Sequence, residues 1–265
     1  MLLAVNIENS EIVVGFIQGR RICRRFNLGV DSARTGDEYS LLLSKASEMN
    51  GCCLDGVQGV VLPGGMPGTL NLEANEKVIE AVSKLIKAQI TVVGPGIKSG
   101  FSIKLDNPAE LGADLVANAA GAIEMFGYPV IIADFGTVNA VSVVDSHKNY
   151  VGGCLSPGIR MSLNALSTAE LLSGVEAEMG VPLIGKNTCS CMRAGVIRGA
   201  ALAVNGFIRE YKREFSLPEN TCTVVTGAQA KNILPYLLPG VRHVPDLTLM
   251  GLAAINDISR RKHYD

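Results

Sequence analysis

The chain has 265 residues, of which 48% are apolar and 18% are charged, and its formal net charge is −1. This length and composition allow two hydrophobic cores and exclude an intrinsically disordered chain. The charge is nearly balanced and no basic block is present, so we expect no nucleic-acid partner.

The opening residues MLLAVNIENS begin without positive charge and soon reach Asn6, Glu8 and Asn9, so we expect no signal peptide. No apolar stretch approaches the roughly 20 residues that cross a bilayer, and we expect no membrane association. Seven cysteines, an odd number without the usual zinc spacing, favour free thiols. These features together predict a cytoplasmic protein.

The first half of the chain alternates short apolar runs with amphipathic stretches. We expect a helix at 36–49 whose apolar stripe is Leu41, Leu42, Leu43, Ala46 and Met49. Asn107 followed by Pro108 predicts the start of a helix that runs to residue 126. The other predicted elements are strands at 2–7, 11–17, 20–26, 56–63 and 90–96, and a helix at 73–88.

The same order then begins again. Strands are predicted at 129–135, 138–146, 149–156 and 222–227, and helices at 158–173, 190–214 and 247–260. Residues 6–9 (Asn-Ile-Glu-Asn) align with residues 134–137 (Asp-Phe-Gly-Thr), so Glu8 corresponds to Gly136. An internal repeat of this kind predicts two similar α/β domains facing each other across a cleft, where ligands usually bind.

Seven segments, in order and in register, resemble the type III pantothenate kinases. They are VGPGIKSGFSI (93–103), NPAELGADLVANA (107–119), ADFGTVNAVSVVD (133–145), GGCLSPGI (152–159), IGKNT (184–188), TGA (226–228) and PDLTLMGL (245–252). The resemblance implies the duplicated ribonuclease-H-like fold of actin and the sugar kinases, an α/β fold, with domains at 1–118 and 119–265. It also implies a homodimer that transfers the γ-phosphate of ATP to pantothenate, the first step of coenzyme A synthesis. Family members need a divalent metal such as Mg²⁺ and a monovalent cation, K⁺ or NH₄⁺.

The resemblance also assigns roles to individual positions. Asp114 matches the catalytic base, and Asp134 matches the monovalent-cation position. The positions that match the pantothenate site are Gly94, Pro95, Gly96, Gly112 and Thr188. The positions that match the ATP site are Asn6, Asn9, Ser10, Gly136, Thr137 and Gly227.

Each of these positions also has a purely structural reading. Asp114 could simply complement a helix dipole, and Asp134 could form an Asx turn. A Gly-Pro-Gly sequence at 94–96 is often an ordinary loop. The residues themselves leave these alternatives open.

Four positions depart from the family pattern. Asn6 and Glu8 replace the aspartate and glycine of the first turn. Leu115 replaces an arginine after the base, and Asn139 stands where the family has a run of threonines. Two unit charges about 4 Å apart interact by about 1 kcal/mol in water and about 4 kcal/mol at an effective dielectric constant of 20. A triphosphate beside Glu8 is therefore expected to bind one to several powers of ten more weakly, unless a metal bridges the two.

Three functions remain open from the sequence. The chain could be a working pantothenate kinase with a weakened nucleotide site. It could instead be a catalytically inactive paralogue that dimerises with, and regulates, an active kinase. A third possibility is a binding protein for pantothenate or another small acid. Whether Glu8 or Glu11 restores metal binding is also open.

Overall fold

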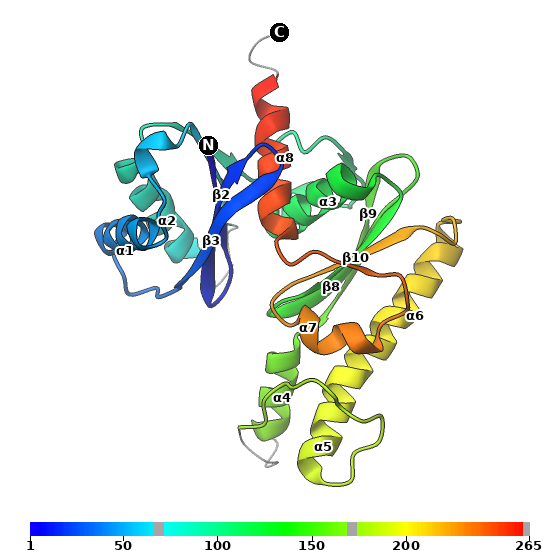
Figure 1. The fold of residues 1–265 in the computed structure, drawn as a ribbon. Helices are drawn as coiled ribbons and strands as arrows, with labels where there is room; N and C mark the ends of the chain where they lie inside the picture. The colour runs from blue at the N-terminus through cyan, green and yellow to red at the C-terminus, as the bar shows by residue number, and fades with distance from the viewer. Residues whose placement is uncertain (66–71, 169–173, 262–265) are drawn as a thin grey trace. The chain divides into compact units, whose positions relative to one another are not determined.

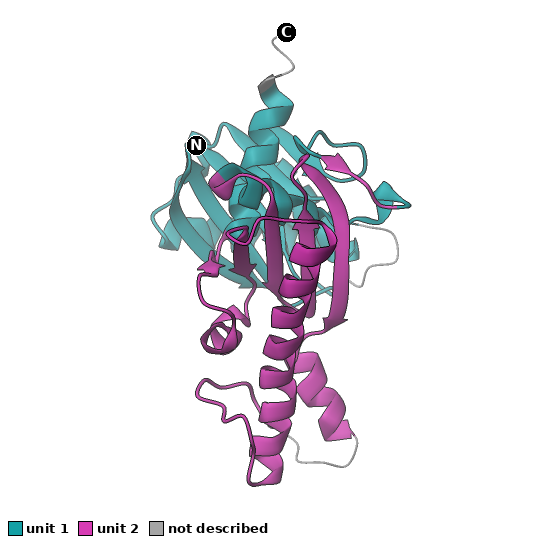
Figure 2. Cartoon of the chain, turned by 90° about the vertical axis from the view of Figure 1, so that its right-hand side faces the viewer, with its two compact units in different colours: residues 1–101, 106–124, 247–265 teal, residues 102–105, 125–246 magenta. Residues whose placement is uncertain are grey.

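The computed structural model describes residues 1–65, 72–168 and 174–261. The chain divides into two compact units (Figure 2). Unit 1 comprises residues 1–101, 106–124 and 247–265, and unit 2 comprises residues 102–105 and 125–246.

Unit 1 contains a five-stranded sheet in the order β3-β2-β1-β4-β5. Its strands are β1 (Leu2–Ile7), β2 (Glu11–Gln18), β3 (Arg21–Gly29), β4 (Gly59–Pro63) and β5 (Gln89–Val93). Its helices are α1 (Gly36–Met49), α2 (Leu72–Leu85), α3 (Ala113–Phe126) and α8 (Leu247–Arg261). Two short 3₁₀ turns occur at Leu54–Gly56 and Pro108–Glu110. Strands β1, β2 and β3 form an antiparallel meander, and β4 and β5 add in parallel.

Helices α1 and α2 lie side by side against one face of this sheet (Figure 1). Their apolar side chains share one core with Leu3, Val5, Val14 and Phe16 of the sheet. The predicted stripe of α1 was partly wrong, because Leu41, Leu42 and Met49 are exposed. The buried positions of α1 are Gly36, Tyr39, Leu43 and Ser47, which follow the 3.6-residue period of one helix face.

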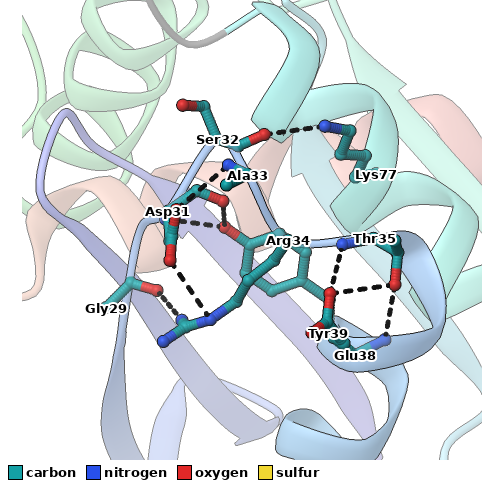
Figure 3. Close-up of polar contacts among 9 residues, drawn as sticks. All are labelled: Gly29, Asp31, Ser32, Ala33, Arg34, Thr35, Glu38, Tyr39 and Lys77. Atoms are coloured by element: carbon teal, nitrogen blue, oxygen red, sulfur yellow. Dashed lines mark hydrogen bonds and ion pairs between the residues drawn. The ribbon is translucent and has the colours of Figure 1, made fainter.

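The start of α1 is fixed by a set of local hydrogen bonds (Figure 3). Thr35 is the N-cap, and with Glu38 it forms a reciprocal capping box. The Tyr39 hydroxyl donates to the carbonyl of Asp31 and accepts from its N–H, each at 2.9 Å. Lys77 of α2 donates to a carbonyl of the same loop. These bonds tie the β3–α1 connection to both helices.

Unit 2 contains a six-stranded sheet in the order β11-β10-β7-β8-β9-β6. Its strands are β6 (Ser102–Ile103), β7 (Val130–Phe135), β8 (Val138–Val144), β9 (Asn149–Pro157), β10 (Cys222–Thr226) and β11 (Arg242–His243). Its helices are α4 (Ile159–Thr168), α5 (Thr188–Arg193), a π-helical segment (Ala194–Arg198), α6 (Gly199–Glu214), α7 (Ala230–Ile233) and a 3₁₀ turn (Leu234–Tyr236).

The two sheets repeat one topology, which confirms the predicted duplication. The order β3-β2-β1-β4-β5 in unit 1 matches β9-β8-β7-β10-β11 in unit 2, and β6 is an addition at the edge. Even the irregularities correspond, because the pairing slips between Phe16 and Ile17 in one copy and between Val143 and Val144 in the other. The chain therefore has a duplicated, ribonuclease-H-like α/β fold.

Three predicted elements differ in detail. Asn107 and Pro108 open only a short 3₁₀ turn, and α3 begins at Ala113 after Gly112. The helix predicted at 190–214 contains the π-helical segment and starts two residues earlier, at Thr188. The helix predicted at 158–173 is described as far as Thr168, and its last five positions lie outside the described residues.

The compact units are not continuous in sequence. The boundary expected between residues 118 and 119 falls inside α3, which belongs to unit 1 as far as residue 124. Helix α8 also belongs to unit 1, although it ends the chain. Its Leu249 packs against Gly15 of β2, so the last helix completes the sheet formed by the first residues.

Within the described ranges, one helical run meets the length and hydropathy of a membrane span, Thr188–Glu214. Its best window has a mean hydropathy of 1.2, and 33% of that window is buried in the structure. This is weak evidence for a membrane span, because core helices of soluble proteins pass the same test.

Candidate active-site residues

The turn between β1 and β2 carries the first group of predicted site residues. The last paired residues of this hairpin are Ile7 and Ile12. Asn6 is buried, and its side-chain amide donates to the Glu8 carboxylate at 3.0 Å. The Glu8 N–H donates to the carbonyl of Glu11 at 2.8 Å and closes the turn. Glu8 is half-buried, while residues 9–11 are exposed.

The environment of Glu8 disfavours its charge. Burial is the largest cause that raises the pKa of Glu8, and the neighbouring carboxylates of Glu11 and Asp114 raise it further. Arg25 of β3 and the amide of Asn6 lower the pKa, but the net direction is upward. The first turn therefore concentrates negative charge where the sequence pattern of the family has a bare glycine.

Asp114 lies in the first turn of α3, as the sequence predicts. Its side chain remains in contact with solvent, yet surrounding protein raises the pKa of the Asp114 carboxyl through desolvation. The N–H of Leu115 donates to this carboxylate and partly offsets the rise. A Cβ at Gly112 would collide with the Asp114 carboxylate, so the residue before the helix must be glycine for this side chain to fold back over the helix start.

The corresponding turn of unit 2 joins β7 to β8. Its last paired residues are Phe135 and Asn139, so it is one residue shorter than the first turn. Asp134 is half-buried at the end of β7, and Thr137 is exposed. The Thr137 carbonyl accepts from the N–H of Gly158 at 3.1 Å, which brings the end of β9 against the turn.

Positions 136 and 227 at this turn are both glycine, but the surrounding protein requires glycine at only one of them. Gly227 has φ +96°, and a Cβ there would lie 2.5 Å from main-chain atoms of Phe135. Gly136 has no left-handed φ, and a Cβ there would meet the Asp134 carboxylate and the Val138 carbonyl only at 3.7 Å. The protein's own packing therefore requires a glycine at 227 and would tolerate a side chain at 136.

Asn139 serves the fold of unit 2. It is 4% exposed, and its side-chain amide donates to the Pro157 carbonyl at 3.0 Å. Its Oδ1 atom has no hydrogen-bond partner among the described residues. The departure from the family pattern at this position thus anchors the end of β9 beside Gly158.

The remaining predicted positions lie on turns. Residues 94–97 form a turn closed by the Ile97 N–H and the Gly94 carbonyl, with Pro95 at the second position and Gly96 at φ +85°, as in a type II turn. Thr188 is exposed at the first position of α5, and Asn187 caps that helix. Ser190, which stands in a region where the family has a glutamate, completes the capping box with Asn187.

The structure thus forms two local groups from the predicted residues. In unit 1, Asn6, Glu8 and Asp114 influence one another, and in unit 2, Asp134, Gly136 and Gly227 meet at one turn. Arg25 was missed by sequence reasoning, because only the pairing of β2 with β3 brings it near Glu8. In the described part of the chain, no group of three or more His, Cys, Asp or Glu side chains could hold a metal ion.

Comparison with known proteins identifies the family of the chain. A model of the type III pantothenate kinase family matches residues 2–210. The chain belongs to the type III pantothenate kinase family. A type III pantothenate kinase of Moorella thermoacetica is 36% identical over 96% of this chain and 98% of the relative. One from Bacillus cytotoxicus is 34% identical over 95% of this chain and 94% of its own length.

Solved structures support the fold alone, because they are distant in sequence. The ethanolamine utilization protein EutJ of Carboxydothermus hydrogenoformans has a TM-score of 0.56 at 15% identity, over 96% of this chain and 89% of that protein. Component A of the (R)-2-hydroxyglutaryl-CoA dehydratase of Acidaminococcus fermentans has a TM-score of 0.55 at 12% identity, over 100% and 99%. The family assignment therefore depends on the sequence relatives.

Proposed function

We propose that this chain transfers the γ-phosphate of ATP to the 4′-hydroxyl of pantothenate, through a nucleotide site weakened at its first turn. The observation that carries the proposal is the match to type III pantothenate kinases over nearly the full length. The seven free cysteines suit a reducing cytoplasm, where we place the protein.

Asp114 is the proposed general base that accepts the proton of the attacking hydroxyl. Phosphoryl transfer needs mainly positioning and charge stabilisation, with one carboxylate to orient and deprotonate the nucleophile. Although the Asp114 side chain is exposed, desolvation by the surrounding protein raises its pKa above the ordinary value of 3.8, which moves a base toward the operating pH. The N-terminal end of the α3 dipole also favours a nearby anion.

The phosphate-binding role falls on the two hairpin turns. We assign the ATP phosphates to residues 6–10 in unit 1 and to Gly136, Thr137 and Gly227 in unit 2. Gly136 supports this assignment, because the fold itself would accept a side chain there, and a ligand that needs bare main chain explains the glycine. Pantothenate is assigned to the turn at 94–96, Gly112 and, from the partner subunit of a homodimer, the residue equivalent to Thr188.

Two ions belong to the proposed reaction. Mg²⁺ would accompany ATP and would offset the negative charge of its phosphates. A monovalent cation would lie at Asp134, whose carboxylate stands next to the main chain of Gly136 and Gly227. Oxygen donors of this kind suit hard cations.

Glu8 is the reason to expect weak nucleotide binding. Its carboxylate, held by Asn6, occupies the turn that we assign to the phosphates. The negative potential of Glu8, Glu11 and Asp114 opposes a triphosphate, and Asn6 brings no charge to hold the metal. The proposed kinase therefore has an elevated dissociation constant for ATP.

The test of the proposed function is a phosphorylation assay. The purified protein with ATP, Mg²⁺ and K⁺ is expected to convert pantothenate to its 4′-phosphate, and Asp114→Asn is expected to lower kcat by about 10² or more. Asp37→Asn is the matched control, because Asp37 lies in the first turn of α1 and also faces a helix dipole. Equal loss of activity in both variants would reduce Asp114 to a helix-capping role.

The changes at Asn6 and Glu8 favour a second candidate, an inactive dimer partner of an active kinase. In that case the wild-type chain has no kinase activity by itself. It raises or lowers the turnover of an intact type III pantothenate kinase when the two are co-expressed. Turnover by the purified chain alone would rule this candidate out.

A further inference from the structure

Helices α3 and α8 cross within unit 1 at a point lined by glycine. A Cβ added to Gly251 would overlap the carbonyl oxygen of Ala117. A Cβ added to Gly121 would lie 2.7 Å from the carbonyl oxygen of Leu247 and 3.0 Å from the nitrogen of Gly251. The two backbones are therefore in direct contact, and a larger side chain at either glycine would force the helices apart.

A partly buried hydrogen bond joins the two helices at the same crossing. The Thr248 hydroxyl of α8 donates to Oδ1 of Asn118 at 2.8 Å, and Asn118 is only 1% exposed. Asn118 lies four residues after Asp114, so both project from one face of α3, one helical turn apart. Because Asn118 itself is buried, losing the Thr248 hydroxyl would remove a partner of its side-chain oxygen, so this contact restrains the position of α3.

The rest of α8 is held by the sheet of unit 1. Leu249 packs against Gly15 of β2. Asn256 accepts a hydrogen bond from Thr91 of β5 at 3.0 Å, with both residues buried. Leu252 and Ile255 are fully buried. Helix α8 thus connects the sheet to the middle of α3, about one helical turn after Asp114.

From these contacts we infer that α8 positions Asp114 for phosphoryl transfer. It does so through the hydrogen bond from Thr248 to Asn118 and through the close backbone contact at Gly121 and Gly251. Thr248 is a positioning residue, because it acts on the base through α3 and has no direct role in the chemistry. The inference rests on the proposed function for its kinetic consequence. Its structural consequence is that α8 restrains α3 about one turn after Asp114, and this does not depend on turnover.

A pair of isosteric substitutions tests the inference. Thr248→Val removes the hydroxyl bonded to Asn118, and Thr91→Val removes the matched threonine–asparagine bond at the other end of α8. Both variants are expected to lower the unfolding temperature by similar amounts. Only Thr248→Val is expected to lower kcat by tenfold or more with the KM for pantothenate within twofold, and Thr248→Ser is expected to restore kcat. Equal kinetic effects of the two valine variants, or no rescue by serine, would overturn the positioning role.

Hydrogen–deuterium exchange separates this inference from the proposed function. Thr248→Val is expected to increase exchange at the amides of residues 113–118 at least fivefold relative to Thr91→Val. If the wild type lacks kinase activity but this local change occurs, the proposed function fails and the coupling of α8 to α3 stands. If exchange at 113–118 is the same in both variants, the coupling is wrong whatever the activity.

Discussion

At the scale of single residues, the contrast between Glu8 and Gly136 determines the proposed chemistry. The two positions are equivalent in the duplicated fold, since each directly follows the first strand of the antiparallel meander in its unit. The described residues with positive φ other than glycine are Lys148 and Ser216, so Glu8 occupies its turn without left-handed strain. The side chain at position 8 therefore causes no left-handed backbone strain, and its proposed effect is on the ligand.

Replacing Glu8 by glutamine is expected to stabilise the protein at neutral pH. Burial and two carboxylates raise the pKa of Glu8, so the folded state binds its proton more tightly than the unfolded state. Wild-type stability consequently falls as pH rises from the ordinary pKa of 4.5 through the raised value, and Glu8→Gln removes this fall.

Thermal unfolding at pH 4 and pH 7.5 measures this effect. The two proteins are expected to differ at pH 7.5 and to converge at pH 4, where Glu8 is protonated in both states. Glu110→Gln is the control, because Glu110 is exposed and accepts a surface hydrogen bond from Asn107. A stabilising effect that is equal at both pH values would contradict the electrostatic explanation.

Residue identity alone proposed candidate positions, but it did not show how they contact one another. The pattern of the family pointed to Asp114 and Gly112, and the structure gives the reason, since a Cβ at Gly112 would strike the Asp114 carboxylate. Arg25 and Asn118 carry no motif. The effect of Arg25 on Glu8 depends on strand register, and the bond of Asn118 to Thr248 depends on the crossing of two helices, so neither is encoded locally in the sequence.

At the scale of elements, strands were predictable and helix faces less so. The buried strands β1 and β7 are short apolar runs with obvious limits. In α1, three consecutive leucines at 41–43 suggested one apolar stripe, but successive helical residues are 100° apart and only Leu43 reaches the core. Pro108 suggested a helix start, but it opens a separate 3₁₀ turn.

The close approach of β10 to β7 gives an element-scale prediction. Gly227→Ala is expected to destabilise unit 2 by about 3 kcal/mol or more, because alanine disfavours φ +96° and its Cβ would clash with Phe135. Gly240→Ala is the control, because Gly240 has φ +88° but no atom within 4 Å of its added Cβ, and about 1 kcal/mol is expected. Chemical denaturation compares the two; equal losses would mean that the clash at Phe135 is relieved at no cost.

At the scale of the whole molecule, the internal repeat made the fold predictable. Residues 6–9 and 134–137 align in sequence, and the two sheets that contain them share one strand order. The repeat could not show that α8 joins unit 1, because a helix far along the chain carries no signal for the sheet it covers. That packing follows from contacts such as Leu249 with Gly15, which arise only after folding.

Whether the chain is a weakened kinase or an inactive dimer partner is also a question about the whole molecule. Family membership is shown by the relatives, and it favours catalysis. The charged first turn is the feature that separates the two readings, because nearly all other matched segments are compatible with the family pattern. The affinity of the whole chain for ATP therefore carries more information than any further structural comparison.

Isothermal titration of MgATP into the wild type and into N6D/E8G measures that affinity. The double variant restores the family pattern of the turn without changing net charge, and we expect it to bind MgATP at least about tenfold more tightly, or about 1.4 kcal/mol. Glu11→Gly, which removes an exposed carboxylate nearby, is expected to change affinity by less than about threefold. Equal affinity of wild type and double variant would show that Glu8 does not oppose the nucleotide, and the chain would then be an ordinary member of its family.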